Sequence, residues 1–443
     1  MIGEESCRRI TQQALSLTGV DQVEAYLSGR DLALTRFANN GIHQNVVHGD
    51  AQLNIRAVIG HRQGRATTND LSGPGIAKAA EQARANALLM PEDPEFQGLA
   101  HPRPPSEIAA YDEKTAGCDP GKRAELVVKV CRRAESQGLN AAGFYRTGAD
   151  ERAVMNTQGA WAYHRGSLAG LLITARSDSS AAWAKGTSWR MKDIQVDALI
   201  NEATEKALSG RDPHPIEPGE YTVVLSHYAV DDILGALSSY GMSAQMVQDG
   251  RSWMIGLKGK SAMSPLISIW DDGCDLDGWP MPFDAEGAPR QRVDIVTNGV
   301  VGDPVYNSYT AGKEGRLSTG HQGGPTGGPS ASNLRMKPGD QSVDQMIEST
   351  DRGLFITRFF YTRLAHSTGC VMTGMTRDGT FLIENGKLSH PVKDLRFTQS
   401  YVEALNGVEA VGQEVKLLMN EGAFSTNVPA LKLSSFNFTG VTV

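Results

Sequence analysis

The stretch LALTRFANNGIHQNVV, residues 32–47, decides how the fold begins. Two runs of strand-forming residues flank Asn40-Gly41, and Asn-Gly is the strongest short-range signal for a two-residue hairpin turn because both turn positions need a positive φ. The stretch therefore predicts two antiparallel strands joined at Asn40-Gly41.

The same hairpin signal recurs in the second half of the chain, at Asn298-Gly299 and at Asn385-Gly386. From Gly219 onward, strand and turn patterns dominate. Long β-rich segments joined by such turns predict a large curved antiparallel sheet or an open barrel. The flanking strands are RVDIVT (292–297) with VVGDPVY (300–306), and GTFLIE (379–384) with KLSHPV (387–392).

The first half of the chain mixes helical and strand patterns. Apolar periodicity predicts helices over 4–18, 121–137 and 193–209, and an alanine-rich helix that follows Gly73-Pro74-Gly75 and ends near Met90. We expect one face of the alanine-rich helix to pack closely on a sheet. That face is the stripe Ile76, Ala79, Ala80, Ala83 and Ala87, and the expected strands include 51–60, 64–69 and several within 141–190.

The predicted fold class is therefore α+β, with N-terminal α+β layers of hairpins and helices followed by a β-rich C-terminal domain. Proline clusters in 91–120 and at 213–218 mark the expected boundaries, because proline interrupts both helices and central strands. The expected divisions are an N-terminal α+β domain (1–90), a proline-rich linker or draped connection (91–120), a central α+β region (121–212) and the β-rich domain (213–443).

Composition excludes several classes of protein. The net charge of −7 argues against a general nucleic-acid-binding surface, which needs clustered Lys and Arg. No apolar run reaches the roughly 18 residues that would span a bilayer, and the N-terminus has no secretory signal pattern. The five cysteines are scattered without a C-x-x-C pair, which favours reduced thiols and a cytoplasmic location.

Residues 226–240, SHYAVDDILGALSSY, predict an amphipathic helix with Ser226 as N-cap and Gly241 as C-cap. Packing against a sheet explains this segment without any ligand. A metal site would pair His227 with Asp231 or Asp232, but a spacing of five residues places His227 and Asp232 about 140° apart on a regular helix. They would converge only if the helix widened locally.

Other candidate sites are weaker. The loop GHQGGPTGGP (320–329) is either a flexible surface loop or a backbone-rich loop that lines a cleft and lets substrate approach closely. His366 and Cys370 offer a weak metal pair, and the acidic cluster at 271–277 fits solvated loop carboxylates better than a calcium loop. The substrate-binding candidates in the loop are Gly320, His321, Gly323, Gly324, Gly327 and Gly328, and the acidic cluster is Asp271, Asp272, Asp275 and Asp277.

Several segments together resemble the TldD/PmbA family of gyrase modulators and peptide-processing metalloproteases, and the likeness runs over nearly the whole chain. Their order and spacing make the match specific. The segments are TRFANNGIHQNV (35–46), YTVVLSHYAVDDILGAL (221–237), RVDIVTNGVVGDPVY (292–306), TGMTRDGTFLIENGKLSHPVKDLRF (373–397) and PALKLSSFNFTG (429–440).

The resemblance implies two kinds of subunit. The TldD-like kind holds zinc with His-Glu-x-x-x-His and a C-terminal cysteine, and cleaves unfolded or leader-bearing peptides inside a dimer. The PmbA-like or TldE-like kind shares the fold and lacks the zinc site. Here only His227 remains: Tyr228 stands at the glutamate position, Asp232 stands at the second histidine, and KLLMNEGAFSTN (416–427) has no cysteine.

This comparison leads to the expectation of a vestigial site at His227, Tyr228 and Asp232, with no metal and no cofactor. A tyrosine cannot serve as a general base near neutral pH without a large pKa shift. The first hypothesis is a non-catalytic TldE/PmbA-like subunit of a cytoplasmic protease, which binds extended peptide. Its partner would be a zinc-bearing TldD-like homologue or a second copy of itself, with 219–443 supplying most of the interface.

Two alternatives stay open at this point. One is a homodimeric peptidase or hydrolase with a site rebuilt from His227 and Asp231 or Asp232, with His321 or His366 as further members. The other is a solitary, non-enzymatic peptide-binding protein. In each case we expect neither a nucleic acid nor a membrane as partner.

Overall fold

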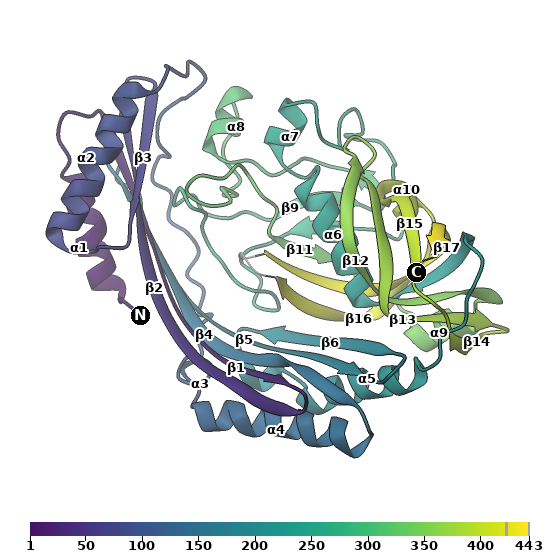
Figure 1. The fold of residues 1–443 in the computed structure, drawn as a ribbon. Helices are drawn as coiled ribbons and strands as arrows, with labels where there is room; N and C mark the ends of the chain where they lie inside the picture. Colours follow the sequence, from purple (N-terminus) through teal and green to yellow (C-terminus); the bar gives the residue numbers. More distant parts are fainter. Residues whose placement is uncertain (421–423, 442–443) are drawn as a thin grey trace.

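The computed structural model describes residues 1–420 and 424–441, which form two large β-sheets with helices packed on them. A six-stranded sheet curves along one side of the molecule, with helices on its convex face and the C-terminal half on its concave side (Figure 1). The α+β class with a β-rich C-terminal half is confirmed.

The first sheet unites the two front regions of the chain. Its order is β3-β2-β1-β4-β5-β6, and its centre is the antiparallel pair β1 and β4, in register from Glu24 opposite Asn156 to Phe37 opposite Gly143. The strands are β1 (Gln22–Ala38), β2 (Gly41–Ile59), β3 (Arg62–Thr68), β4 (Asn140–Asn156), β5 (Trp161–Arg176) and β6 (Ala181–Ser188); the helices are α1 (Glu4–Leu15), α2 (Gly73–Leu89), α3 (Glu113–Ala116), α4 (Pro120–Ser136), the 3-10 turn η1 (Met191–Asp193) and α5 (Val196–Ser209).

The first hairpin turn lies one residue earlier than predicted. Ala38 pairs with Gly41, so the turn residues are Asn39 and Asn40, with φ of 51° and 57°. Asparagine tolerates this left-handed region, so two asparagines supply the turn and Gly41 becomes the first strand residue. The other two predicted turns are confirmed: Asn298-Gly299 and Asn385-Gly386 have positive φ at both residues.

The predicted alanine stripe of α2 is confirmed. The buried residues of this helix are Gly75 and the five predicted ones, Ile76, Ala79, Ala80, Ala83 and Ala87. The helix lies so close to β3 that a Cβ on Gly64 would sit 2.1 Å from the backbone nitrogen of Ala87. Only small side chains fit such an approach, which explains both the alanines and the glycine.

The proline-rich segment between α2 and α4 is a draped connection. Phe96 and Leu99 are buried against Val58. The carbonyl of Ala100 accepts a 2.8 Å hydrogen bond from Asn156 Nδ2. The segment is therefore held against the first sheet along its length.

The second sheet closes on itself. The path β17-β15-β13-β12-β7 returns to β17, because β7 also pairs with β17, so these strands form a ring. The pairs β7 with β12 and β11 with β17 are parallel. The strands are β7 (Gly219–Leu225), β8 (Ile269–Asp271), β9 (Val293–Thr297), β10 (Val300–Val301), β11 (Asn333–Met336), β12 (Arg352–His366), β13 (Val371–Glu384), β14 (Lys387–Pro391), β15 (Leu395–Ser400), β16 (Val408–Asn420) and β17 (Phe424–Val441).

The helix α6 (His227–Ser239) starts directly after β7 and buries its apolar face against β12 and β17. Ser226 is its N-cap, as predicted, and accepts the Tyr228 N–H at 3.3 Å. The prediction of Gly241 as the C-cap was wrong, because the helix ends at Ser239 and its C-cap is Tyr240. Gly241 instead allows Trp253 to pack, because a Cβ there would lie 1.9 Å from the indole ring.

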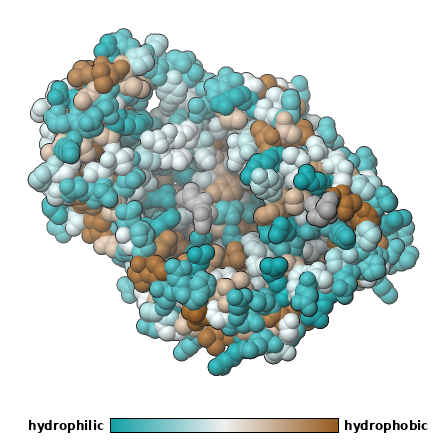
Figure 2. All heavy atoms as spheres, in the orientation of Figure 1, coloured by the Kyte–Doolittle hydropathy of each residue, from teal (hydrophilic) through white to brown (hydrophobic). Residues whose placement is uncertain are grey.

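The remaining helices are short, and none of the helices among the described residues is long and apolar enough to cross a membrane. They are α7 (Ala244–Gln248), α8 (Ser308–Lys313), α9 (Val343–Glu348) and α10 (Tyr401–Asn406). The surface is hollowed between the first sheet and the C-terminal half (Figure 2).

Candidate functional site

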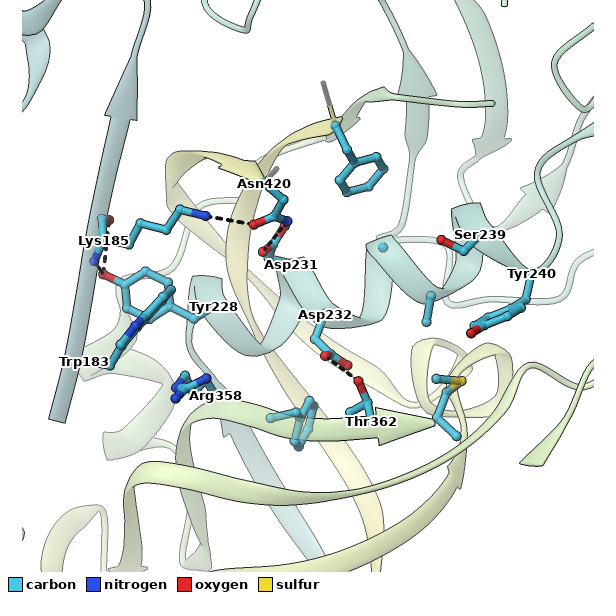
Figure 3. Close-up of a pocket in the computed structure, with 15 residues that line it drawn as sticks. Trp183, Lys185, Tyr228, Asp231, Asp232, Ser239, Tyr240, Arg358, Thr362 and Asn420 are labelled. Carbon is cyan, nitrogen blue, oxygen red and sulfur yellow. Dashed lines mark hydrogen bonds between the residues drawn. The ribbon is translucent and has the colours of Figure 1, made fainter. Parts of the chain in front are cut away.

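The helix α6 presents its first turns to a cavity of about 450 Å³ between β6, β12 and the β16–β17 pair. Trp183 and Lys185 reach this cavity from β6, Asp231 and Asp232 from α6, and Arg358 from β12 (Figure 3). The candidate vestigial site therefore lies at the junction of the two sheets.

Tyr228 is tied into this junction by its hydroxyl group. The oxygen accepts the backbone N–H of Lys185 at 3.0 Å and the Lys416 ammonium at 2.7 Å, and the hydroxyl donates to Glu202 Oε2 at 3.1 Å. The ring meets Trp183 edge-on, with centroids 4.7 Å apart. Burial and the Glu202 carboxylate raise the pKa of Tyr228 well above its usual value, so the phenol stays neutral.

Glu202 carries the negative charge of this cluster. Its carboxylate accepts hydrogen bonds from Lys206 Nζ at 3.0 Å and from Lys416 Nζ at 2.9 Å. Burial opposes ionisation, but the charges of Lys206 and Lys416 outweigh it and hold the pKa of Glu202 at about 2. The cluster is an ionised carboxylate between two ammonium groups.

His227 lies beside this cluster with one ring nitrogen engaged. Its Nε2 is 3.1 Å from the carbonyl oxygen of Glu414. Burial, and then the positive charge of Lys416, lower the pKa of His227. The imidazole is therefore neutral near pH 7, and its Nε2–H donates to the carbonyl.

Asp231 and Asp232 project in different directions from the helix. Asp232 accepts hydrogen bonds from the hydroxyls of Tyr401 at 2.8 Å and Thr362 at 2.9 Å. Asp231 accepts a 2.6 Å hydrogen bond from the Thr426 hydroxyl. Burial raises the pKa of both carboxyl groups, to about 6 for Asp232.

The helix therefore keeps His227 and Asp232 apart, as a regular spacing of five residues requires. His227 lines a second cavity, of about 760 Å³, whereas Asp232 lines the first. The helix is α-helical from His227 to Ser239 and does not widen to bring the two together.

The donor set at this position does not fit zinc. A zinc site needs three or four donors that converge without a competing cation. Here His227 supplies one nitrogen, and an ammonium group is bonded to the Tyr228 oxygen. Within residues 1–420 and 424–441, no group of three or more His, Cys, Asp or Glu side chains is placed to hold a metal ion. Part of the segment 416–427, at 421–423, lies outside the described residues.

The glycine-rich loop divides into a buried start and an open remainder. Gly320 and His321 are buried, and Gly323 and Gly327 are exposed. Gly323 and Gly324 line a small cavity of about 200 Å³. Phe424 borders this cavity and also the cavity at α6, so the two spaces are neighbours. Gly328 packs against the Gln245 side chain.

His321 bridges two parts of the C-terminal half. Its Nε2 lies 2.9 Å from Asp271 Oδ1, and its Nδ1 lies 2.9 Å from Thr319 Oγ1. Asp271 is fully buried and also accepts the Asn333 N–H at 2.7 Å. The prediction of a solvated carboxylate was therefore wrong for Asp271, because a strand, β8, carries it into the core.

His366 and Cys370 are not brought together as metal ligands. His366 is exposed, and its Nδ1 lies 3.1 Å from Thr368 Oγ1. Cys370 is buried, which raises the pKa of its thiol to about 12. A neutral buried thiol is a poor metal ligand.

Sequence reasoning missed Lys185, Glu202 and Lys416. These residues come from β6, α5 and β16, and Lys416 lies 188 positions from Tyr228 in the chain. No local pattern marks any of them, since only the docking of the two sheets brings them together.

Family models and individual relatives both match this chain to the same protein family. Residues 23–87, 104–211 and 218–440 match the models of PmbA/TldA metallopeptidase domain 1, the central domain and the C-terminal domain. The metalloprotease PmbA of Escherichia coli O157:H7 is 24% identical over 97% of both chains. A PmbA homologue of Haemophilus influenzae is 24% identical over 87% of this chain and 86% of its own.

Two solved structures share the fold. TldE from Thermococcus kodakarensis superposes with a TM-score of 0.85 at 20% identity and covers 98% of this chain and 99% of its own. A Thermotoga maritima protein described as a putative modulator of a DNA gyrase gives 0.86 at 21% identity, over 98% of this chain and all of its own.

The buried carboxyl of Asp232 predicts a pH-dependent stability. Its folded-state pKa is raised from 3.8 to about 6, so the stabilisation by the protonated form is fully present below about pH 4 and is lost as the pH rises through 6. Asp232→Asn mimics the protonated form. We expect its free energy of unfolding to rise relative to the parent protein by ~1–3 kcal/mol between pH 4 and pH 7.

Urea denaturation at a series of pH values measures this difference. Asp178→Asn, which removes an exposed carboxylate, is the matched control and should show no comparable trend. A difference between Asp232→Asn and the parent that is constant over this pH range would contradict the prediction.

The lysine at the vestigial site predicts weak zinc binding. We expect the purified protein to contain well under one zinc per chain and to gain no thermal stability from added zinc. Tyr228→Glu places a carboxylate next to His227 in the sequence but keeps the Lys416 ammonium. Adding Lys416→Met should tighten zinc binding beyond that of Tyr228→Glu alone, as measured by calorimetric titration. Stoichiometric zinc in the parent protein, with a chelator lowering its stability, would refute this.

Proposed function

Because the chain belongs to the PmbA/TldD family of metallopeptidases, we propose that it is a non-catalytic subunit of a peptide-processing protease. In this role it binds extended peptide, while a zinc-bearing homologue supplies the catalytic site. The observation that carries the proposal is the Lys416 ammonium bonded to the Tyr228 hydroxyl at 2.7 Å.

That contact supports a role without catalysis at this position. Hydrolysis by such an enzyme requires a metal with an open coordination position and a base that takes a proton from water. Tyr228 is neutral and its hydroxyl is already engaged with Lys185, Lys416 and Glu202. Asp232, in turn, accepts hydrogen bonds from the hydroxyl groups of Thr362 on β12 and Tyr401 on α10.

The strand edges at the junction of the two sheets support the proposal that the chain binds extended peptide. Edge β6 of the first sheet faces β16 of the second. Thr187 Oγ1 bridges them: it donates to the Leu417 carbonyl at 2.8 Å and accepts the Met419 N–H at 3.0 Å. The 760 Å³ cavity runs along both strands. An extended peptide adds to such an edge by main-chain hydrogen bonds, with little sequence preference. The glycine loop 320–329, beside the α6 cavity, would offer further backbone contacts.

An open edge of β2 supports a partner subunit. The strand β3 pairs only with Leu53–Ile59, so residues 41–52 of β2 have no outer neighbour among the described strands. Every residue from Gly41 to Asp50 is exposed, and Val47 is 72% exposed. Exposed edges are usually protected by lysine, proline or a covering element. This stretch contains no lysine, arginine or proline.

We therefore propose a heterodimer with a TldD-like homologue, or a homodimer, in which the β2 edge adds to the interface expected from 219–443. We place the protein in the cytoplasm, where all five of its cysteines, which are free, would remain reduced.

The proposed role predicts how the protein behaves in peptidase assays. Alone, it should not cleave unfolded peptides. Mixed with a His-Glu-x-x-x-His homologue from the same cell, it should raise that homologue's rate of cleavage, measured by release of a quenched fluorophore. Chelator-insensitive cleavage by the lone chain, abolished by His227→Ala, would instead support a rebuilt catalytic site.

The proposed partner predicts a dimer. Light scattering at micromolar concentration should give the mass of a dimer for the chain alone or with its homologue, with an interface above ~1,000 Å². Val47→Lys places a charge on the open β2 edge and should weaken the dimer. Leu89→Lys, at an 83% exposed position on α2, is the control and should not. A monomer under both conditions would favour the solitary peptide-binding protein.

A further inference from the structure

A separate cavity of about 830 Å³ lies where the β5–β6 turn meets β13 and β15. It is lined by cationic side chains from several segments that are distant in sequence, and its acidic members are Asp378 and Asp394. This concentration of positive charge stands out in a chain with a net charge of −7. We call this cavity the arginine pocket, and its cations are Arg176, Arg358, Arg377, Lys393 and Arg396.

Two of these guanidinium groups stack on aromatic rings. Arg358 lies over the rings of Trp183 at 5.0 Å and Phe360 at 5.3 Å, and Arg377 lies 4.3 Å over Phe360. Arg358 Nε also donates to Asp378 Oδ2 at 2.5 Å. Arg377 Nε also lies 4.0 Å from Asp378 Oδ1, so stacking and the shared carboxylate orient both guanidinium groups.

The other cations are open to a ligand. Arg176, Lys393 and Arg396 are exposed. In the described parts of the chain, none of the three forms an ion pair with N···O within 4.0 Å. The Asp394 carboxylate is turned toward the hydroxyls of Thr376 and Thr380, at 3.2 and 3.3 Å. The pocket therefore keeps an excess of uncompensated positive charge.

The arginine pocket borders the cavity at α6. Arg358 lines both, and Trp183, which stacks on Arg358, lines the α6 cavity. A peptide that lies extended along β6 and past α6 would reach the arginine pocket with its next residues, since a strand advances about 3.3 Å per residue.

We propose that the arginine pocket binds the carboxylate side chains of an acidic segment in the extended peptide. The inference rests on the proposed peptide-binding function and adds the substrate class. Planar guanidinium groups match carboxylates with paired hydrogen bonds. A nucleic acid is the less suitable ligand, because its phosphates require a continuous basic surface rather than one pocket on an acidic protein.

Fluorescence anisotropy with the full-length chain tests this. The probes are two labelled, unstructured peptides of equal length, one with an Asp-Glu tract and one with Asn-Gln at the same positions. We expect the acidic peptide to bind about tenfold more tightly at low salt, and this advantage to vanish near 1 M salt. Arg176→Gln/Arg396→Gln should weaken binding of the acidic peptide three- to tenfold and leave the neutral peptide unchanged.

Lys393→Gln is a second, independent variant with the same expected direction. Arg133→Gln, on the exposed side of α4, is the matched control and should change neither affinity. Equal affinity for the two peptides would overturn the acidic-segment inference and leave the peptide-binding function standing. Failure of both peptides to bind would overturn the proposed function as well. Displacement of the acidic peptide by a single-stranded oligonucleotide at lower concentration than by unlabelled acidic peptide would assign the pocket to nucleic acid instead.

Discussion

The hydroxyl group of Tyr228 joins the two halves of the molecule. It forms hydrogen bonds with the backbone of β6 in the first sheet, with Glu202 on α5 and with Lys416 on β16. Its own helix, α6, packs on β12 and β17 of the second sheet. Loss of this hydroxyl would remove one hydrogen bond from the Lys185 N–H and one from the Lys416 ammonium, which would keep its bond to Glu202; a hydrogen bond to a charged group is worth about 1.5–3 kcal/mol. The junction of the sheets, and so the shape of both cavities along it, depends on this contact.

The same contact makes the position unsuited to a metal ion. The nearby charge is already balanced, since Glu202 is ionised between Lys206 and Lys416. A divalent ion beside His227 would add positive charge next to two ammonium groups and would find no compensating carboxylate. The position therefore holds a cation of the chain's own, the Lys416 ammonium at the Tyr228 hydroxyl.

Local features of this chain could be predicted from sequence, and features set by docking could not. The turn at Asn298-Gly299, the cap at Ser226 and the buried stripe of α2 each follow from neighbouring residues. The ring closed by β7 and β17, and the contact between Tyr228 and Lys416, join segments about 200 positions apart. His321 is a further example. Its glycine-rich sequence is typical of a surface loop, but the imidazole is buried in the core, where it lies 2.9 Å from Asp271 Oδ1. His227, Tyr228 and Asp232 could be singled out only through the family resemblance.

The functional consequence lies in how the two sheets meet. Their facing edges, β6 and β16, are bridged by side chains rather than by a continuous main-chain ladder: Thr187 bonds at Leu417 and Met419, and Lys185 Nζ bonds Asn420 Oδ1 at 2.8 Å. Main-chain donors and acceptors must find partners, and an edge that is bridged through side chains leaves main-chain positions with which an extended chain could pair. In the proposed function, an extended peptide at this junction would have glycine backbone on one side of α6 and stacked guanidinium groups on the other.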